Sequence, residues 1–249
     1  MGTVLVKAWG VYGPQGDSLL LQEALHRASV PSGAHALDVC TGTGLIALTA
    51  ARLGALRVRA VDTCYRAVLT ARCNAWLNRL PVHVEHGDFR SCLTHRQRYD
   101  VITANPPYVP CPADADHERG QARAWNAGLD GRRYLDQLCA MAPHLLTAEG
   151  MLLIVHSALC GPERTLDLLG QAGLKASVVA RRQQPFGPVL RSRAEWLTER
   201  GLIERGQREE ELVVIRADRV PPAPCPHPHR GRTGAFGSAL NPGGLRPAA

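Results

Sequence analysis

Polar residues and glycines gather directly after several apolar runs, and the first such group is Asp-Val-Cys-Thr-Gly-Thr-Gly at residues 38–44. Gly42 and Gly44 allow the backbone to turn tightly and to approach a ligand at positions where a Cβ would clash. With Ala47 they fit the G-x-G-x-x-A pattern of dinucleotide sites, and a plain strand-to-helix turn is the alternative. The group favours a nucleotide-like cofactor at this turn.

Two acids after later apolar runs suit the same kind of cofactor. Asp62 lies eighteen residues beyond Gly44, where a carboxylate can accept hydrogen bonds from both hydroxyls of a ribose. An exposed strand-end acid is the alternative. Asp88 and Phe89 follow a third run and suit an adenine ring, because Asp88 can accept from its amino group while Phe89 supplies an apolar wall. On its own this pair fits a simple turn equally well.

The fourth group, Asn105-Pro106-Pro107-Tyr108, indicates the chemistry most directly. Two successive prolines remove two backbone donors and fix two φ angles, so the chain after the strand is rigid. Asn105 offers a side-chain carbonyl oxygen, Pro106 a main-chain carbonyl and Tyr108 a flat face. Together these groups can hold a planar –NH2 group, with two acceptors for its hydrogens and one ring against its face.

At these residues the sequence resembles the S-adenosylmethionine-dependent methyltransferases of the seven-stranded class, specifically the HemK-like branch that methylates the glutamine side-chain amide of translation release factors. The resemblance runs from about residue 11 to residue 217, and Asn-Pro-Pro-Tyr is its most specific element. Residues 12–21 resemble the segment that closes over the cofactor, residues 125–131 the loop after Asn-Pro-Pro-Tyr, and residues 206–214 the lead into the last strand of the short family members.

The resemblance implies S-adenosylmethionine as the cofactor and assigns roles to the matching positions. The catalytic residues it implies are Asn105, Pro106 and Tyr108. The cofactor-binding residues it implies are Ser18, Asp38, Cys40, Gly42, Gly44, Asp62, Asp88, Phe89 and Asn105, with Asp17 as a further candidate beside Ser18 at the methionine end. Cys40 departs from the family, which usually has glycine at that position.

The resemblance also implies a release-factor-like protein substrate. Only about ten residues precede residue 12, so we expect no helical amino-terminal domain of the kind by which longer bacterial members grip release factors. The short archaeal and eukaryotic members pair with a small zinc-containing activator that covers an apolar edge. A similar partner is therefore implied for this chain.

Other acceptors stay open. An exocyclic amine of an RNA or DNA base would need a basic face with aromatic platforms and a route for a flipped base, whereas aromatic residues make up only 5% of this chain. A small molecule or a protein lysine are further acceptors. The chain could also be an inactive, cofactor-binding regulatory subunit, but such a subunit has no physical need for residues 105–108.

The elements that must position these residues alternate along the chain. Apolar runs predict strands at residues 36–40, 57–62, 82–85, 100–104, 151–156, 176–180 and 212–217, and helical patterns lie at residues 45–53, 65–77, 131–146 and 162–172. This alternation predicts an α/β fold with a doubly wound, mostly parallel sheet that binds ligands at the carboxyl ends of its strands. The resemblance adds that the sheet has seven strands in a Rossmann-like methyltransferase fold, with the last strand antiparallel.

Composition limits the class of protein. With 249 residues, 45% hydrophobic, the chain has a normal globular balance, and residues 1–220 are predicted to form the methyltransferase domain. Residues 221–249 are rich in proline and glycine and are predicted to be a disordered tail. Of the net charge of +7, +4 remains without the three tail arginines, a mild excess that does not require nucleic acid.

The same sequence predicts where the protein works. No window is apolar enough for a membrane span, and the amino-terminal residues lack the pattern of a secretion signal. The eight cysteines form no C-x-x-C pair, so we expect reduced, mostly buried thiols. Together these features predict a cytoplasmic protein without a membrane partner.

Several other polar residues favour plainer interpretations. His156 and Ser157 lack an acid for a catalytic triad and should fill the sheet end. No metal site is predicted, because His83 and His86 should point to different faces and because a tail group lacks a fourth ligand and a scaffold. That tail group is Cys225, His227 and His229. A solvated basic face is favoured over an anion-binding patch for four arginines, which are Arg181, Arg182, Arg191 and Arg193.

Overall fold

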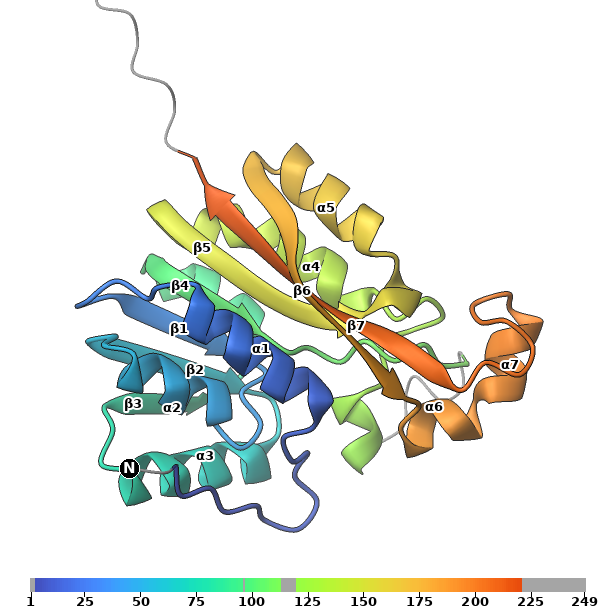
Figure 1. Cartoon of the computed structure of the whole chain (residues 1–249). Coiled ribbons are helices and arrows are strands. Elements are labelled where there is room, and N and C mark those ends of the chain that lie inside the picture. Colours follow the sequence, from blue (N-terminus) through green and yellow to red (C-terminus); the bar gives the residue numbers. More distant parts are fainter. Residues whose placement is uncertain (1–2, 96, 113–119, 221–249) are drawn as a thin grey trace, which may run out of the picture.

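A sheet of seven strands runs through the computed structural model, which describes residues 3–95, 97–112 and 120–220 (Figure 1). The strand order is β3-β2-β1-β4-β5-β7-β6. Neighbours from β3 to β5 are parallel, and β7 is antiparallel to both β5 and β6. The predicted α/β sheet with an antiparallel last strand is confirmed. The strands are β1 (His35–Val39), β2 (Arg57–Asp62), β3 (Val82–His86), β4 (Tyr99–Ala104), β5 (Leu146–Ser157), β6 (Leu174–Pro185) and β7 (Glu209–Arg219).

Helices cover both faces of the sheet, as Figure 1 shows. One face carries α1 (Gly16–Arg27), α2 (Leu45–Arg52) and α3 (Tyr65–Leu77), and the other carries α4 (Arg133–Leu145) and α5 (Pro162–Gln171). Short helices α6 (Pro188–Ser192) and α7 (Ala194–Glu199) fill the connection between β6 and β7, and 3-10 turns follow β3 (Phe89–His95), precede α4 (Gly120–Ala124) and follow β5 (Ala158–Cys160). This doubly wound arrangement leaves the carboxyl ends of the parallel strands open to a ligand.

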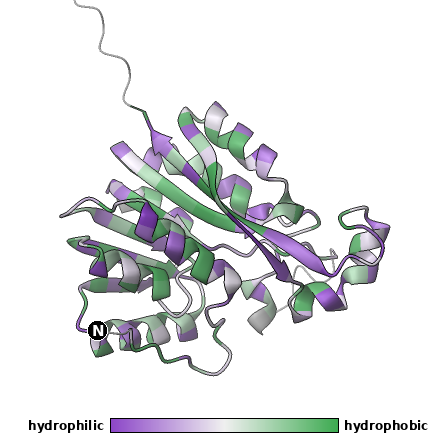
Figure 2. Cartoon of the chain, in the orientation of Figure 1, coloured by the Kyte–Doolittle hydropathy of each residue, from purple (hydrophilic) through white to green (hydrophobic). Residues whose placement is uncertain are grey.

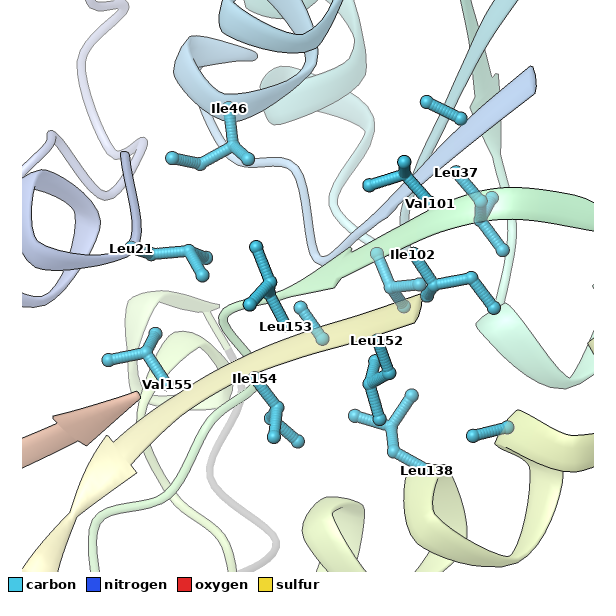
Figure 3. Close-up of a cluster of buried hydrophobic side chains, with 14 of the residues drawn as sticks. Leu21, Leu37, Ile46, Val101, Ile102, Leu138, Leu152, Leu153, Ile154 and Val155 are labelled. Atoms are coloured by element: carbon cyan, nitrogen blue, oxygen red, sulfur yellow. The ribbon is translucent and has the colours of Figure 1, made fainter. Parts of the chain in front are cut away.

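The core lies between the central strands and the helices on each side. Leu37, Ile102 and Leu152 are almost completely buried, and Figure 3 shows them on neighbouring strands with Leu138 of α4 packed against them. Figure 2 shows the hydrophobic colouring concentrated along these strands. A strand covered on both faces needs apolar residues at successive positions, which is why these segments read as continuous apolar runs.

Three helices were not expected from the sequence. The run of leucines in α1 follows Gly13, Pro14 and Gly16, which obscure where a helix begins. The helices α6 and α7 are too short for helical periodicity to show, and they bury a small separate cluster made of Phe186, Leu190, Leu197 and Ile203. The predicted bounds of β5, β6 and β7 are also too short at one or both ends, because these strands continue into polar residues.

Three further predictions concern the cysteines, membrane-spanning helices and the tail. The described cysteines are all free thiols, with Cys92, Cys111, Cys139 and Cys160 buried and with Cys64 and Cys73 exposed. No helix in the part of the chain that the structure describes is long and apolar enough to cross a membrane. The predicted tail, residues 221–249, with Cys225, His227 and His229, lies outside the described residues, so its disorder stays a prediction.

Candidate active site

A cavity of about 580 Å³ lies at the carboxyl ends of β1, β2 and β4. Strand order reverses between β1 and β4, the place where open α/β sheets bind ligands. Its volume falls within the range of small-molecule sites, roughly 300–1,000 Å³. Ten of the predicted residues line it, namely Ser18, Asp38, Cys40, Gly42, Asp62, Asp88, Phe89, Asn105, Pro106 and Tyr108.

Gly44 is the predicted residue that does not line the cavity. It precedes α2 with a φ of 85°, and a Cβ at this position would lie 3.1 Å from the Cβ of Ala71 on α3. The structure therefore gives Gly44 a packing role, because its missing side chain lets the start of α2 approach α3. It shapes the turn that carries Gly42 without contacting the cavity itself.

The turn after β1 is joined to the end of β2 through Asp62. The backbone N–H of Gly42 donates to one carboxylate oxygen of Asp62 at 2.9 Å, and the N–H of Cys64 donates to the other at 2.8 Å. Burial raises the pKa of Asp62, and these two hydrogen bonds oppose the rise. Each carboxylate oxygen keeps lone pairs beyond its single backbone contact, so Asp62 can still accept hydrogen bonds from a ligand in the cavity.

Asp38 supports the same turn from beneath and is 3% exposed. The hydroxyls of Thr41 and Thr103 donate to its two carboxylate oxygens at 2.5 and 2.7 Å. Burial raises the pKa of Asp38 to about 6, although both of these hydrogen bonds act to lower it. A carboxyl group of this pKa changes its charge close to physiological pH, and Asp38 itself lines the cavity.

Arg90 binds Asp88, the third predicted cofactor contact. Arg90 donates to both oxygens of Asp88, through Nε at 3.0 Å and Nη2 at 2.8 Å. Burial acts to raise the pKa of Asp88, but the contacts with Arg90 outweigh it and the pKa is lowered. Asp88 is therefore an ionised acceptor that Arg90 already occupies in part, while the neighbouring Phe89 is buried and lines the cavity.

Residues 105–108 form a corner after β4 that is fixed from two sides. The chain beyond it pairs with a later loop, since the N–H of Val109 donates to the carbonyl oxygen of Trp125 at 2.8 Å. The thiol of Cys160 donates to the carbonyl oxygen of Tyr108 at 3.0 Å. Arg193 adds a further anchor from the α6–α7 connection by donating to the carbonyl oxygen of Pro110 at 3.0 Å. The corner is therefore held by contacts as well as by its prolines.

Asp17 joins the start of α1 to this corner. Its carboxylate is 3% exposed and accepts hydrogen bonds from the hydroxyls of Tyr12 at 3.2 Å and Tyr108 at 3.1 Å. The hydroxyl of Ser18 also lies 3.2 Å from this carboxylate, and the Ser18 oxygen accepts from Nδ2 of Asn105 at 3.3 Å. Five cavity-lining side chains therefore belong to one hydrogen-bond network.

The network has consequences for the two tyrosines. Burial and the adjacent Asp17 carboxylate raise the pKa of both Tyr12 and Tyr108 well above the ordinary value. Both hydroxyls therefore stay protonated and donate to Asp17. The sequence predicted only that Tyr108 offers a flat face, whereas the structure also uses its hydroxyl to hold the ring in place.

The plainer candidates lie away from the cavity. His156 is fully buried, with Nδ1 at 2.9 Å from the Ser157 carbonyl oxygen and Nε2 at 3.2 Å from the Thr165 hydroxyl, and burial lowers its pKa to about 4. It fills the sheet end, as expected. His83 and His86 are both exposed on β3. No group of three or more metal-ligating side chains occurs in the described residues.

The arginines expected on a solvated face are instead mostly paired. Arg181 forms an ion pair with Glu211, and Arg182 pairs with Glu23 at 2.7 Å. Arg193 is bound to the corner after β4, as described above. Arg181 and Arg191 are exposed, as expected, whereas the expectation was wrong for Arg193, because the corner after β4 packs beside it.

Several cavity residues were missed from the sequence. They are Arg123, Tyr134 and Gln137, whereas Tyr12 and Trp125 begin the segments 12–21 and 125–131 that the sequence had singled out by resemblance. Tyr134 and Gln137 lie three residues apart on α4, so they share one helix face, and this spacing was a usable signal. Arg123 comes from a short 3-10 turn that carries no such pattern.

The fold and the cavity define the class of the protein. Residues 9–119 match the methyltransferase small domain family. Among solved structures the chain is similar to the E. cuniculi Mtq2-Trm112 complex (TM-score 0.58, 20% identity, 84% of this chain and 99% of that chain). It is also similar to the T. thermophilus 16S rRNA N2 G1207 methyltransferase bound to AdoMet and guanosine (TM-score 0.52, 21% identity, 83% and 44%). Together these matches show that the chain has a methyltransferase fold.

Relatives with higher sequence identity show which family of methyltransferases the chain belongs to. A putative protein N5-glutamine methyltransferase of Methanocaldococcus jannaschii is 34% identical over 72% of this chain and 89% of its own length. The methyltransferase HEMK2 of Mus musculus is 30% identical over 70% and 84%. A tRNA1(Val) (adenine(37)-N6)-methyltransferase of Phocaeicola vulgatus is 36% identical over 60% and 62%. The chain belongs to the HemK-like family of methyltransferases.

Proposed function

We propose that the protein transfers a methyl group to the side-chain amide nitrogen of a glutamine in a protein of the release-factor type. The observation that carries this proposal is the orientation of Asn105. Its Nδ2 donates to Ser18, and no described residue hydrogen-bonds its Oδ1. An acceptor oxygen in the cavity wall is what a planar –NH2 group requires, because that group presents two hydrogens to its surroundings.

The cavity residues fit the cofactor. Asp62 keeps acceptor capacity for ribose hydroxyls, and Phe89 with the partly occupied Asp88 offers a place for an adenine ring. Gly42, with a φ of 55°, keeps the backbone of the first turn open to a close approach. When bound, S-adenosylmethionine supplies an electrophilic methyl carbon on its sulfonium.

The residues of the chain contribute to the reaction by aligning the amide nitrogen and by stabilising the charge that develops on it. An amide nitrogen is a poor nucleophile because its lone pair is delocalised into the carbonyl. Fixing it in line for attack can supply roughly 7–11 kcal/mol of the barrier. The oxygens of Asn105 and Pro106 would accept its hydrogens and stabilise the positive charge that develops on the nitrogen. No strong general base is needed if the proton leaves late.

The relatives support a protein acceptor. Two that cover most of this chain are named a protein glutamine methyltransferase and HEMK2, and a Bordetella pertussis relative, 33% identical, is named a release factor glutamine methyltransferase. A release-factor acceptor implies that the reaction occurs in the cytoplasm. The complex of the structural neighbour with Trm112 supports the proposal that this chain also works with a small, zinc-containing activator.

A nucleic-acid amine is the second candidate. Arg90, Arg123 and Arg133 are exposed residues that line the cavity, together with Trp125 and Tyr134. Cationic and aromatic side chains at the mouth of a site are what a flipped base and its phosphates require. The tRNA adenine methyltransferase relative gives this acceptor a precedent in a similar sequence.

One experiment separates the two acceptors. The purified protein is incubated with radiolabelled S-adenosylmethionine and cell extract, with and without a candidate activator, and the products are digested with protease or nuclease. We expect label that survives nuclease and is lost with protease, and a methylated glutamine in mass spectra of peptides. Label that survives protease and is lost with nuclease would transfer the assignment to RNA or DNA.

A further inference from the structure

We propose that Asp17 is a positioning residue that determines which atom of the Asn105 amide faces the acceptor. The inference rests on the proposed function, in which Asn105 accepts a hydrogen from the substrate nitrogen. Asp17 does not need to touch the substrate for this. It acts through Ser18, which lies between the two side chains.

The argument starts from the number of hydrogens available. An ionised carboxylate has only acceptor oxygens, and the first turn of a helix, where Asp17 lies in α1, favours such a group. The single hydroxyl hydrogen of Ser18 must therefore point to Asp17, at 3.2 Å. What remains on the Ser18 oxygen is lone pairs, so any group on its other side has to be a donor.

Asn105 meets this requirement in only one of its two amide orientations. With Nδ2 toward Ser18, a hydrogen lies between the two heavy atoms, which are 3.3 Å apart. With the amide reversed, Oδ1 would face lone pairs, and the polar contact would be lost. The carboxylate of Asp17 therefore makes Oδ1 the atom that is left to accept from a substrate.

The other oxygen of the Asp17 carboxylate binds a second residue of the corner after β4. The hydroxyl of Tyr108 donates to Oδ2 of Asp17 at 3.1 Å, while Ser18 is bound to Oδ1. Asp17 is 3% exposed and Tyr108 is 8% exposed, so water does not replace these contacts easily. One buried carboxylate thus positions two residues of the corner after β4, Asn105 through Ser18 and Tyr108 directly.

The Asp17→Asn variant should reverse this control. The new amide keeps its oxygen toward the hydroxyls of Tyr12 and Tyr108 and directs its nitrogen to the Ser18 oxygen, with loss of the contact that the Ser18 N–H makes to Asp17 Oδ1 at 2.5 Å. This frees the Ser18 hydroxyl to donate to Asn105 and turns Oδ1 of Asn105 away from the acceptor. We expect kcat at saturating S-adenosylmethionine to fall about a hundredfold, the scale of removing one aligned polar contact to a transition state. The dissociation constant for the cofactor, measured by calorimetry, serves as the check that the cavity has kept its shape.

The decisive comparison is Ser18→Ala in both backgrounds. In the wild-type background it removes the correct contact, and we expect kcat to fall. In the Asp17→Asn background it removes the hydroxyl that donates to Oδ1 of Asn105, so the Asn105 amide can rotate back. We expect kcat to rise about tenfold over Asp17→Asn alone. A purely structural role for Asp17 gives losses of the same sign in both backgrounds, and that result would overturn the proposal.

A second measurement does not depend on turnover. In protein with ¹⁵N-labelled asparagine, the Asn105 side-chain amide signals are assigned by their absence in Asn105→Ala. We expect one Nδ2 hydrogen to be protected from solvent exchange in the wild type and unprotected in Asp17→Asn. Equal protection in both proteins would contradict the proposal. A wild type that methylates no glutamine would refute the proposed function while leaving this measurement interpretable.

A matched pair of variants covers the case in which Asp17→Asn does not fold. Ser18→Thr keeps the hydroxyl, and Ser18→Val has nearly the same shape without it. We expect the threonine variant to keep the protected Asn105 hydrogen and to have a higher kcat than the valine variant, and we expect the valine variant to lose that protection. Equal behaviour of the two would show that the Ser18 hydroxyl does not relay the orientation.

Discussion

The thiol of Cys160 donates a hydrogen bond to the carbonyl oxygen of Tyr108 across 3.0 Å, and it does so from the far end of β5. Gly131 packs directly against both partners of this hydrogen bond. A Cβ at Gly131 would lie 2.3 Å from that carbonyl oxygen and 2.8 Å from Sγ of Cys160. The backbone of the corner after β4 therefore depends on the absence of a side chain in a loop more than twenty residues later.

Gly131→Ala should displace Tyr108 and slow the reaction. The matched control is Gly128→Ala, because both glycines have positive φ, 72° and 84°, whereas a Cβ at Gly128 would have no atom within 4 Å. Both variants pay about 1–2 kcal/mol for a left-handed alanine. Only Gly131→Ala must also move the corner, and a shift of about 1 Å can cost a hundredfold in rate.

The measurements are kcat at saturating cofactor and the free energy of unfolding in urea. We expect Gly131→Ala to be at least about tenfold slower than Gly128→Ala and also less stable. Equal values for the two variants would show that the contact with Tyr108 has no effect on the corner.

Cys40→Gly should be at least as stable as Cys40→Ala. Cys40 has a φ of 58°, a region that costs an L-residue about 1–2 kcal/mol, and the family usually has glycine here. Both substitutions remove the thiol, so their difference isolates the strain caused by the Cβ. Glycine is ordinarily the less stable of the two by about 0.5–1 kcal/mol through its backbone entropy. We expect urea unfolding to show glycine equal or superior at this position, and the ordinary order would contradict the strain.

The sequence was informative where one element determines the position of a residue. Asp62 ends a strand, and Asp88 and Asn105 each follow one. Parallel strands bring their carboxyl ends to one edge, so the common location of these residues in one cavity follows from the alternation of strands and helices. These inferences need only local pattern and topology.

The remaining features depend on contacts between distant segments. Ser18 and Asn105 are 87 residues apart, and the pairing of Arg193 with Pro110 spans 83. No periodicity or turn chemistry encodes such pairs, because they arise when α1 and the α6–α7 connection pack beside the corner. This is why the network around Asp17 was not foreseen and why Arg193 was wrongly expected on a solvated face.

The stability of the protein should depend on the ionisation of Asp38. Its folded-state pKa of about 6 lies above the ordinary 3.8, so the folded protein holds this proton more tightly than the unfolded chain does. The stabilising contribution is therefore present below about pH 4 and is lost as the pH rises to about 6. The loss amounts to about 3 kcal/mol.

Asp38→Asn removes this titration and nearly preserves the shape of the side chain. Urea unfolding of both proteins at several pH values gives the difference in stability, which cancels the titration of the other acids. We expect the wild type to lose stability relative to the variant between pH 4 and pH 6. A difference that stays constant over this range would mean that the pKa of Asp38 is not raised.

Asn105→Ala should abolish turnover while leaving cofactor affinity largely intact. The substitution removes the oxygen that we assign to the substrate amide, and such losses typically cost about a hundredfold to a thousandfold in kcat. Asp62→Ala is the converse control, because we propose that Asp62 binds the ribose and not the acceptor. It should weaken cofactor binding at least about tenfold, with a smaller effect on kcat at saturation, since charge-assisted hydrogen bonds are each worth about 1.5–3 kcal/mol.

The two variants separate binding from chemistry when calorimetry and turnover are measured on the same preparations. Calorimetry gives the fraction of enzyme that holds the cofactor, and turnover is divided by that fraction. If Asn105→Ala lost cofactor binding and kept normal turnover per bound complex, Asn105 would belong to the cofactor site and not to the acceptor. The orientation of its amide toward Ser18 favours the opposite result, because the free oxygen is then available to the substrate nitrogen.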